Sequence, residues 1–428
     1  MTAAMGTILV VWVVALFLGP PIWLTMALAG SAFVLSQHFD ALVIAQQEVS
    51  AANSFTFVAA PLFILMGHVM NHAGVTLRIF AFAQALVGWM RGGLCHANVI
   101  ASMIFAGMSG SAVAEAGGLG MVEIKAMREG GYPPAMAAGL TAAAATIGPI
   151  IPPSLPMVVY GAAAEVSVGR LFLAGVIPGV LMGTALMVLC AFMARSLNLP
   201  RGDFPTARDL WAKFRGAFFA LMTPVVLLAG MLSGVFTPTE AAAVATLYAL
   251  VLGLLVYRTF SLRNLPRLVL ETIETTGVVM ALVMAAKLLG WCLAISRIPQ
   301  ITGEALTAFT SEPIVFLLIV NLLLLFVGCF MEGIAAMLIL IPILTPVAAR
   351  LGIDPVHFGL VFVLNLMVGT VTPPVGVVLY VVANIAKVSF ETMSRAIMPF
   401  LVPLVVVLAA TTLWPPLATW LPNLMIGR

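Results

Sequence analysis

Two segments that join a glycine to a proline pair could bind a small cation. They run from Gly148 to Pro153 and from Gly369 to Pro374. Proline has no backbone N–H and disfavours a helical conformation in the residue before it, so carbonyl groups near such a pair lose their helical partners. A hydroxyl group stands near each segment, from Ser109 and Thr372 respectively. Carbonyl and hydroxyl oxygens at a helix break can coordinate Na⁺ or H⁺, while the N-terminal ends of half-helices attract anions.

The two segments belong to an internal repeat. At one constant displacement along the chain, Gly131 also matches Gly352 and Pro134 matches Pro355, which indicates related halves over residues 54–194 and 277–420. The charge pattern described below places Arg128 and the corresponding region around Arg350 on opposite faces of a membrane. The repeats are therefore predicted to be inverted, as in secondary transporters that bind their solute and ions at interrupted helices.

Each half also contains a polar tip between two apolar stretches. The tips are Gly107 to Ser111 and Gly328 to Gly333. The apolar stretches are too short to cross a membrane twice, so we interpret each as a re-entrant hairpin. A single Gly-Pro-Pro in a membrane helix is more often a packing kink. Two related ones, each paired with a polar tip, favour a binding site.

The composition requires a membrane around the chain. Of 428 residues, 62% are hydrophobic and 8% are charged, and the mean hydropathy is +1.16, whereas soluble domains contain about 25% charged residues. With about 20 apolar residues per crossing, the length allows roughly ten to twelve crossings. The net charge of +3 does not suggest a nucleic-acid partner. The four cysteines are far apart with no CxxC, so neither a disulfide framework nor a zinc site is indicated.

Basic residues set the orientation. One cluster lies between Arg195 and Arg215 and a second between Arg258 and Arg267. About 40 residues separate them, which is room for a helix pair turning near Thr237, so both clusters can face the cytoplasm under the positive-inside rule. Most of the 19 basic residues then lie inside. The apolar N-terminal run predicts a first membrane helix, with a break at residues 19–21 and an undetermined topology for the first two helices.

The predicted fold class is an all-α polytopic membrane protein of the elevator-type ion-transporter architecture, with inverted repeats, two re-entrant hairpins and two broken helices. Residues 1–53 form N-terminal scaffold helices. Residues 54–194 form repeat 1, with a hairpin at about 97–127 and a broken helix at about 134–166. Residues 195–276 form the cytoplasmic basic loop and connecting scaffold helices. Residues 277–428 form repeat 2, with a hairpin at about 313–350 and a broken helix at about 356–387, followed by a C-terminal helix.

These features resemble the large membrane (M) subunit of tripartite ATP-independent periplasmic (TRAP) transporters over nearly the whole chain. The resemblance rests on the runs Ala60–Gly67, Ser109–Ala112, Gly148–Ser154, Phe172–Gly179, Gly234–Ala243, Met331–Gly333 and Pro342–Pro346. Glu115 and Glu332 depart from the family pattern, since many relatives have the shorter aspartate there. The tip after Glu332 also lacks a proline that relatives often have.

The resemblance implies positions for two Na⁺ ions and a solute. The first Na⁺ would lie between the first hairpin and the first broken helix, at Ala106, Ser109, Gly148, Ile151 and Pro153. The second would lie at the symmetric place, at Gly328, Gly369, Thr372 and Val375. The solute would lie between the hairpin tips, near Ser111, Ser154 and Glu332. No other metal and no cofactor is expected.

The resemblance further implies an elevator mechanism in the bacterial inner membrane. A transport domain would move a small carboxylate or other organic acid together with Na⁺, after a periplasmic binding protein (P) delivers the solute. A small four-helix membrane subunit (Q) would complete the scaffold as a separate chain, because no Q sequence is fused here. The sequence contains no Walker A motif, so an ion gradient and not ATP would drive transport. The sequence leaves open the solute, the Na⁺ stoichiometry, coupling to H⁺ and the oligomeric state.

Four ionisable residues in apolar surroundings are candidates for function. Glu332 could bind an ion or the solute, or transfer a proton. Glu115 fits a structural hydrogen bond equally well. Lys287 could attract an anion, lie along apolar surface with its charge in water, or pair with Glu240. Glu240 itself follows Thr237 at a predicted helix start, where an acidic residue is favoured by the helix dipole.

Two rival functions remain at this stage. A stand-alone Na⁺- or H⁺-coupled dicarboxylate symporter would have the same repeats without partners. An intramembrane enzyme would need a catalytic group such as Ser109 or the pair His68 and His72, which have a helical i, i+4 spacing. No histidine base lies near Ser109 and no HExxH pattern is present, so the sequence predicts a transporter and not an enzyme.

Overall fold

The computed structural model describes residues 2–309 and 312–427, and the described residues are almost entirely helical. Within the described residues, seven helices are long and apolar enough to cross a membrane, and several shorter apolar helices accompany them. The predicted all-α membrane fold is confirmed. Re-entry of the hairpins from one membrane face stays a prediction.

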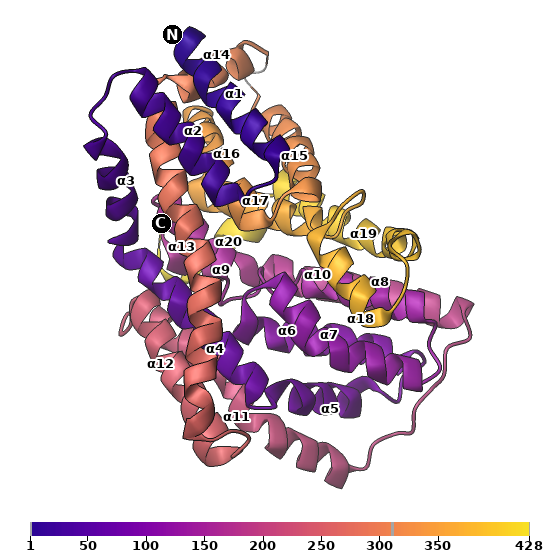
Figure 1. Ribbon diagram of the computed structural model, residues 1–428. Coiled ribbons are helices and arrows are strands. Elements are labelled where there is room, and N and C mark those ends of the chain that lie inside the picture. The colour runs from indigo at the N-terminus through magenta and orange to yellow at the C-terminus, as the bar shows by residue number, and fades with distance from the viewer. Residues whose placement is uncertain (1, 310–311, 428) are drawn as a thin grey trace.

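One arm of the molecule is organised around the long helix α13 (Leu265–Ile295). Figure 1 shows α13 running along this arm beside the N-terminal helices, and α13 contacts α2 (Ile22–Ser36), α3 (Leu42–Ala52) and α4 (Ala59–His72). The remaining helices of this arm are α1 (Thr2–Leu18), α11 (Ala207–Leu232), α12 (Pro238–Val251) and α14 (Ile298–Phe309). We call this group the spine.

The first repeat contains hairpin 1 and broken helix 1. Hairpin 1 comprises α6 (Gly93–Ser109) and α7 (Ala112–Glu129), and α5 (Val75–Val87) precedes it. Broken helix 1 comprises α8 (Pro134–Ala145), the non-helical residues 146–154 and α9 (Leu155–Ala163). The long helix α10 (Val168–Ser196) follows.

The second repeat has the same order of elements. Hairpin 2 comprises α15 (Pro313–Phe330) and α16 (Gly333–Arg350). Broken helix 2 comprises α17 (Pro355–Gly369), the non-helical residues 370–376 and α18 (Val377–Ala386). It is followed by α19 (Phe390–Leu413) and α20 (Pro416–Met425).

The two repeats exchange contacts in a symmetric way. The second half of broken helix 1, α9, contacts α16 and α17 of the other repeat, and α18 in turn contacts α7 and α8. The helices that follow the repeats behave alike, because α10 contacts α17 and α19 contacts α8. This reciprocal packing agrees with two related halves that form a single body.

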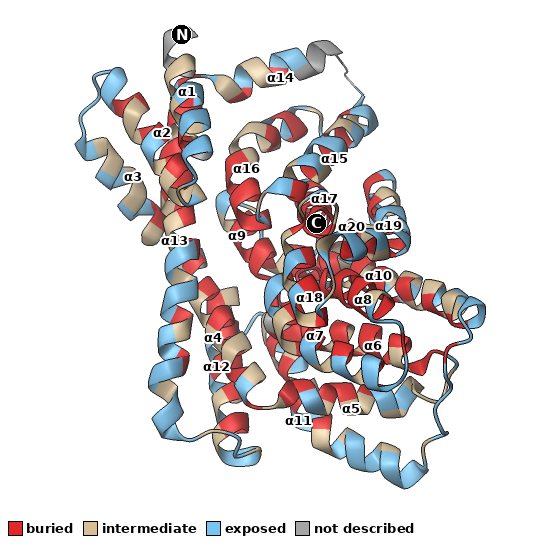
Figure 2. Cartoon of the chain, turned by 45° about the vertical axis from the view of Figure 1, so that its right-hand side comes forward, coloured by how far each residue is buried: buried red, intermediate tan, exposed pale blue. Residues whose placement is uncertain are grey.

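The first halves of the broken helices form the centre of that body. Every residue of α17 from Val356 to Gly369, and every residue of α8 from Met136 to Ala145, is buried (Figure 2). A helix that is apolar on all sides must be surrounded by protein or lipid. Because α8 and α17 are enclosed by the hairpins and by α10 and α19, their breaks lie inside the protein, where irregular backbone is tolerated.

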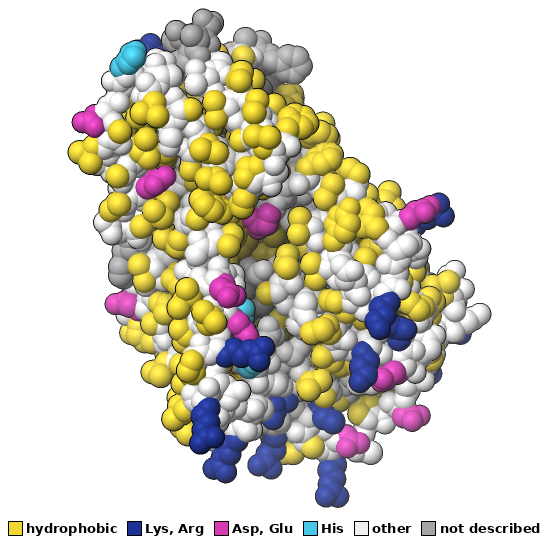
Figure 3. Space-filling model, in the orientation of Figure 1, with side chains coloured by type: hydrophobic (Ala, Val, Ile, Leu, Met, Phe, Trp, Pro, Cys, Tyr) yellow, Lys and Arg dark blue, Asp and Glu magenta, His cyan; other side chains and the backbone are white. Residues whose placement is uncertain are grey.

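Basic side chains are concentrated at one end of the molecule. Figure 3 shows that most of the visible Lys and Arg side chains gather at the end opposite the N-terminus, with apolar side chains covering the middle. This end includes the lower ends of α11 and α13 (Figure 1), which border the two basic clusters used to predict the cytoplasmic face.

Candidate functional site

The tip of hairpin 1 touches broken helix 1 directly. The chain turns at Gly110, whose φ of +58° is the left-handed conformation that favours glycine. A Cβ atom at Gly110 would lie 2.9 Å from the carbonyl oxygen of Pro153. The amide N–H of Leu155, at the start of α9, donates to the Gly110 carbonyl at 3.4 Å. The hairpin tip and the helix break therefore form one unit.

Residues 146–154 are held by their own polar groups. The Ser154 hydroxyl donates to the carbonyl of Pro149 and accepts a hydrogen bond from the amide of Met157 at 3.2 Å. Among the described residues, no hydrogen bond is donated to the carbonyls of Gly148, Ile151 or Pro153. The segment thus combines a fixed shape with carbonyl oxygens available to a ligand.

The tip of hairpin 2 makes the matching contact with broken helix 2. The amide of Gly376 donates to the carbonyl of Cys329 at 2.9 Å. Gly328 and Gly369 are in backbone contact, since a Cβ atom on Gly369 would lie 2.7 Å from the Cα atom of Gly328. The Thr372 hydroxyl donates to the carbonyl of Val368 at 2.7 Å, which leaves its oxygen free to accept or to coordinate.

The residues of both predicted cation sites lie at or near the two helix breaks, and their role as Na⁺ ligands stays a prediction. Ala106 lies in the last turn of α6. Its neighbour Gly107 is close to the first break, because a Cβ atom on Gly107 would lie 3.7 Å from the carbonyl oxygen of Pro152. The Ser109 backbone ends α6, and its side chain lies outside the described part of the chain. Thr372 and Val375 both lie in residues 370–376, next to the Gly328–Gly369 contact.

Sequence reasoning left the role of Glu115 open, and the structure places it at the first break. Its buried side chain lies against Gly148, so that a Cβ atom there would overlap its Oε2 atom. Glu115 is on α7 and Gly148 follows α8, and only tertiary packing brings them together. Its position one turn after the N-cap Ser111 was the one available signal.

A cleft of about 1250 Å³ separates the hairpin tips from the spine, and we call it the hairpin cleft. Ser111 of hairpin 1 and Glu332 of hairpin 2 line it, opposite α4 and α13. Each of these side chains also caps a helix: Ser111 Oγ accepts from Ala114 N, and Glu332 Oε2 accepts from Ala335 N at 3.1 Å. The third predicted solute residue, Ser154, is fully buried, and its neighbour Leu155 lines the cleft instead.

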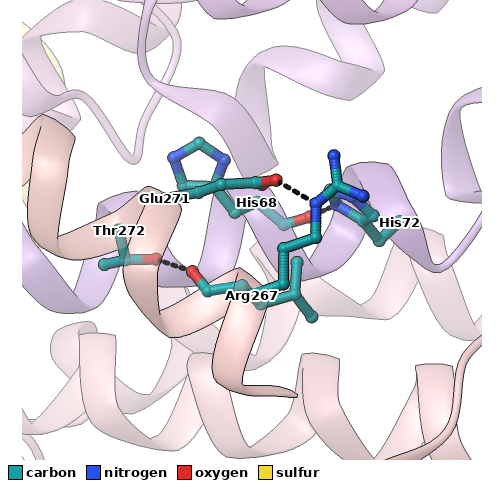
Figure 4. A network of polar contacts seen from close by, with 6 residues as sticks. His68, His72, Arg267, Glu271 and Thr272 are labelled. Carbon is teal, nitrogen blue, oxygen red and sulfur yellow. Dashed lines mark hydrogen bonds and ion pairs between the residues drawn. The ribbon is translucent and has the colours of Figure 1, made fainter. Parts of the chain in front are cut away.

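Polar side chains of α4 and α13 stand beside this cleft (Figure 4). His72 Nδ1 lies 3.0 Å from the carbonyl oxygen of His68, and both histidines line the cleft. Glu271 pairs with Arg267, with 3.1 Å between Oε1 and Nε, in front of the histidines. Within the described ranges, no group of three or more His, Cys, Asp or Glu could hold a metal ion.

A second cleft of about 1170 Å³ lies elsewhere between the spine and the repeats. It is lined by residues of α3, α12 and α13 and by the loop between α9 and α10, and the exposed Lys287 is one of them. Lys287 forms none of the ion pairs found among the described residues. Glu240 instead closes a capping box, accepting from the amide and the hydroxyl of Thr237 at 2.8 Å each. The predicted role of Glu240 at a helix start is therefore confirmed.

Comparison with known proteins assigns this architecture to a family. Residues 9–417 match the model of the tripartite ATP-independent periplasmic transporter, DctM component. The chain is 45% identical over 420 residues to the sialic acid TRAP transporter large permease protein SiaM of Vibrio cholerae, covering 97% of this chain and 98% of that protein. It is 43% identical over 369 residues to the C4-dicarboxylate TRAP transporter large permease protein DctM of Pseudomonas aeruginosa, covering 86% of each.

A solved structure supports the fold independently. The YdaH transporter of Alcanivorax borkumensis, described as having an unusual topology, superposes with a TM-score of 0.66. The match covers 89% of this chain and 88% of that one at 16% sequence identity, so it bears on the fold alone.

Proposed function

This chain belongs to the DctM component family of tripartite ATP-independent periplasmic transporters, and we propose from this premise that it imports a small organic acid together with Na⁺. It is a multi-pass protein of a bacterial inner membrane and a transporter, not an enzyme. The Na⁺ coupling, the solute class, the mechanism and the partners are the proposed elements.

The observation that best supports Na⁺ coupling is the pair of helix breaks at the buried ends of α8 and α17. Each break offers carbonyl oxygens and adjoins a hairpin tip through a direct backbone hydrogen bond. Thr372 adds a hydroxyl oxygen at the second break. Half-helix ends and unwound carbonyls of this type coordinate Na⁺ in other secondary transporters.

The hairpin cleft suits a small anionic solute. Helices α7 and α16 both begin at it, and helix N-termini favour negative charge. Ser111 and Glu332 supply polar atoms on opposite hairpin tips. The relatives named for sialic acid and for C4-dicarboxylate make an organic acid the class to test.

An elevator movement would use the boundary between the spine and the repeats. Both clefts lie along that boundary, so the spine and the repeat body are incompletely packed against each other in two places. The repeat body itself is tightly interlocked by the reciprocal contacts of α9 and α18. A rigid body beside a loosely packed boundary is suited to moving as a unit.

The family's tripartite name makes a binding protein P and a small membrane subunit Q the expected partners. The proposal is tested by reconstituting the chain with candidate P and Q proteins from the same cell and measuring uptake of labelled organic acids into vesicles. We expect uptake only with an inward Na⁺ gradient, and only with P present. Uptake without P would favour the stand-alone symporter, and uptake without a Na⁺ gradient would overturn Na⁺ coupling.

A further inference from the structure

A buried polar cluster inside hairpin 1 has no part in the sites described so far. It joins three helices through Asn98 of α6, Glu123 of α7 and Thr141 of α8. The exposed fractions of these residues are 0%, 1% and 1%. An acidic side chain in such surroundings requires a compensating interaction, because an isolated buried carboxylate is strongly disfavoured.

The cluster has too few hydrogen-bond donors if Glu123 is ionised. The Asn98 amide nitrogen donates to Glu123 Oε2 at 2.9 Å and to Thr141 Oγ1 at 2.8 Å, so both of its N–H groups are engaged. Two buried acceptors, Glu123 Oε1 and Asn98 Oδ1, have no hydrogen-bond partner among the described residues. One proton on Oε1 would remove the charge and turn an acceptor without a partner into a donor.

Glu123 forms none of the ion pairs found among the described residues. Helix α7 packs against α5, α6, α8 and α18. Arg78 of α5 donates to the carbonyls of Ala73 and Gly74 and stacks over Tyr257. His96 of α6 is two residues from Asn98 and so on the other side of that helix.

The other ionisable groups on these helices do not supply a positive partner either. Lys125 is exposed and pairs with Glu129 at 3.9 Å, and Arg128 is exposed. Glu115 is about two helical turns from Glu123 and is itself acidic. Cys95 of α6 and Tyr380 of α18, which stacks on Phe390, cannot carry a positive charge. Helix α8 contains no ionisable residue.

The second repeat offers an internal comparison. There, Asn365 of α17 donates to Asn321 Oδ1 of α15 at 2.6 Å, and Asn321 donates to Thr412 Oγ1 of α19 at 2.9 Å. The Thr412 hydroxyl group in turn donates a hydrogen bond to the carbonyl of Leu408 at 2.8 Å. This network also links the hairpin to the first half of the broken helix, and it contains only neutral groups. A neutral Glu123 would make the two networks alike in charge.

We propose that Glu123 is a proton-binding site: its carboxyl group holds a proton inside hairpin 1 and exchanges it with water at the end of α7. Glu123 is six residues before the end of α7 at Glu129, a rise of about 9 Å along the helix. The last five residues of α7 include the exposed Lys125, Arg128 and Glu129, on the predicted cytoplasmic side. The proton allows the hairpin to change position without an unbalanced buried charge. This proposal is independent of the Na⁺ sites.

Infrared spectroscopy of the purified protein at neutral pH tests the proposal directly. The difference spectrum between wild type and Glu123→Gln should show the loss of a C=O stretch from a protonated carboxylic acid. The matched control Glu129→Gln removes an exposed acid from the same helix and should show the loss of a carboxylate stretch instead. A carboxylate loss in Glu123→Gln would overturn the proposal.

A second variant and a second readout distinguish loss of the proton-binding group from misfolding of the protein. Glu123→Asp keeps an acid and should shift the protonated C=O band without abolishing it; a carboxylate band in its place would contradict the proposal.

In the reconstituted complex, uptake by wild type and Glu129→Gln should fall as the pH rises, because Glu123 loses its proton. Uptake by Glu123→Gln should not fall over the same pH range. If uptake by this variant falls with rising pH as it does in wild type, the proposal is also overturned.

Discussion

Gly328 of hairpin 2 and Gly369 of broken helix 2 meet through their backbones, with 2.7 Å between the Gly328 Cα atom and the place a Cβ atom on Gly369 would occupy. Real Cβ atoms do not approach other atoms so closely, so Gly369 has no room for a side chain. A Cβ atom on Gly328 would lie 3.1 Å from the Gly369 Cα atom, which is also a tight contact. The contact sets the distance between the hairpin tip and the segment that contains Thr372.

Gly369→Val should therefore abolish transport. Forcing three additional carbon atoms into a packed contact costs about 1–3 kcal/mol, and it separates the groups of the proposed second Na⁺ site. Thermal unfolding and vesicle uptake measure the two effects. Gly277→Val is the matched control, because Gly277 is on α13 with no atom near its absent Cβ. Full transport by Gly369→Val would show that the close approach is unnecessary.

Thr372→Val should weaken Na⁺ binding while preserving the shape of the side chain. At ten times its Kd, a bound ion stabilises the native state by roughly 1.4 kcal/mol, and a tenfold weaker site would reduce this to about 0.4 kcal/mol. The measurement is the shift in Tm between NaCl and choline chloride at equal ionic strength.

The control for this substitution is Thr184→Val. Thr184 on α10 bonds its hydroxyl to the carbonyl four residues earlier, as Thr372 does, but it is exposed and lies outside both breaks. It should keep the whole Na⁺-dependent shift in Tm. An equal shift in wild type and Thr372→Val would exclude the threonine hydroxyl as a Na⁺ ligand.

Local sequence signals located the breaks well and the partners of buried polar groups poorly. Prolines and glycines mark helix ends by their own backbone chemistry, so both breaks were found, although α6 continues to Ser109 and α15 to Phe330, within the expected tips. The Glu115–Gly148 contact and the Asn98–Glu123 bond depend on how α6, α7 and α8 pack. No spacing along the chain encodes that arrangement.

Ser154 shows how a local signal can be given the wrong weight. It was expected beside the solute, yet a serine directly before a helix with proline at its second position is also a typical N-cap. In the structure Ser154 is this N-cap. It is buried, and its hydroxyl group donates one hydrogen bond and accepts another. Its proposed contribution to the solute site is therefore indirect, through the position of α9.

Ser154→Ala should destabilise the protein more than loss of a cap elsewhere. Losing an N-cap costs about 1 kcal/mol, and the buried Pro149 carbonyl would also lose its donor, for about 1–3 kcal/mol more. Ser167→Ala removes an exposed N-cap from α10 and should cost only the first amount. Equal changes in Tm for the two variants would show that the Pro149 bond adds nothing.

Glu332 has two separable roles, as the cap of α16 and as an acidic group in the hairpin cleft. Glu332→Gln keeps an oxygen that can accept from Ala335 N, so the Tm should change little. It removes the charge, and a hydrogen bond from a hydroxyl or N–H group of the solute to a charged carboxylate contributes about 1.5–3 kcal/mol. The KM for the solute should therefore rise roughly tenfold or more, with the Na⁺-dependent shift in Tm retained.

The control is Asp354→Asn, which alters the acidic cap of α17 outside both clefts and should leave KM unchanged. If Glu332→Gln also leaves KM unchanged while Glu332→Ala lowers the Tm, Glu332 acts only as a helix cap, and the solute must be held by other residues of the cleft.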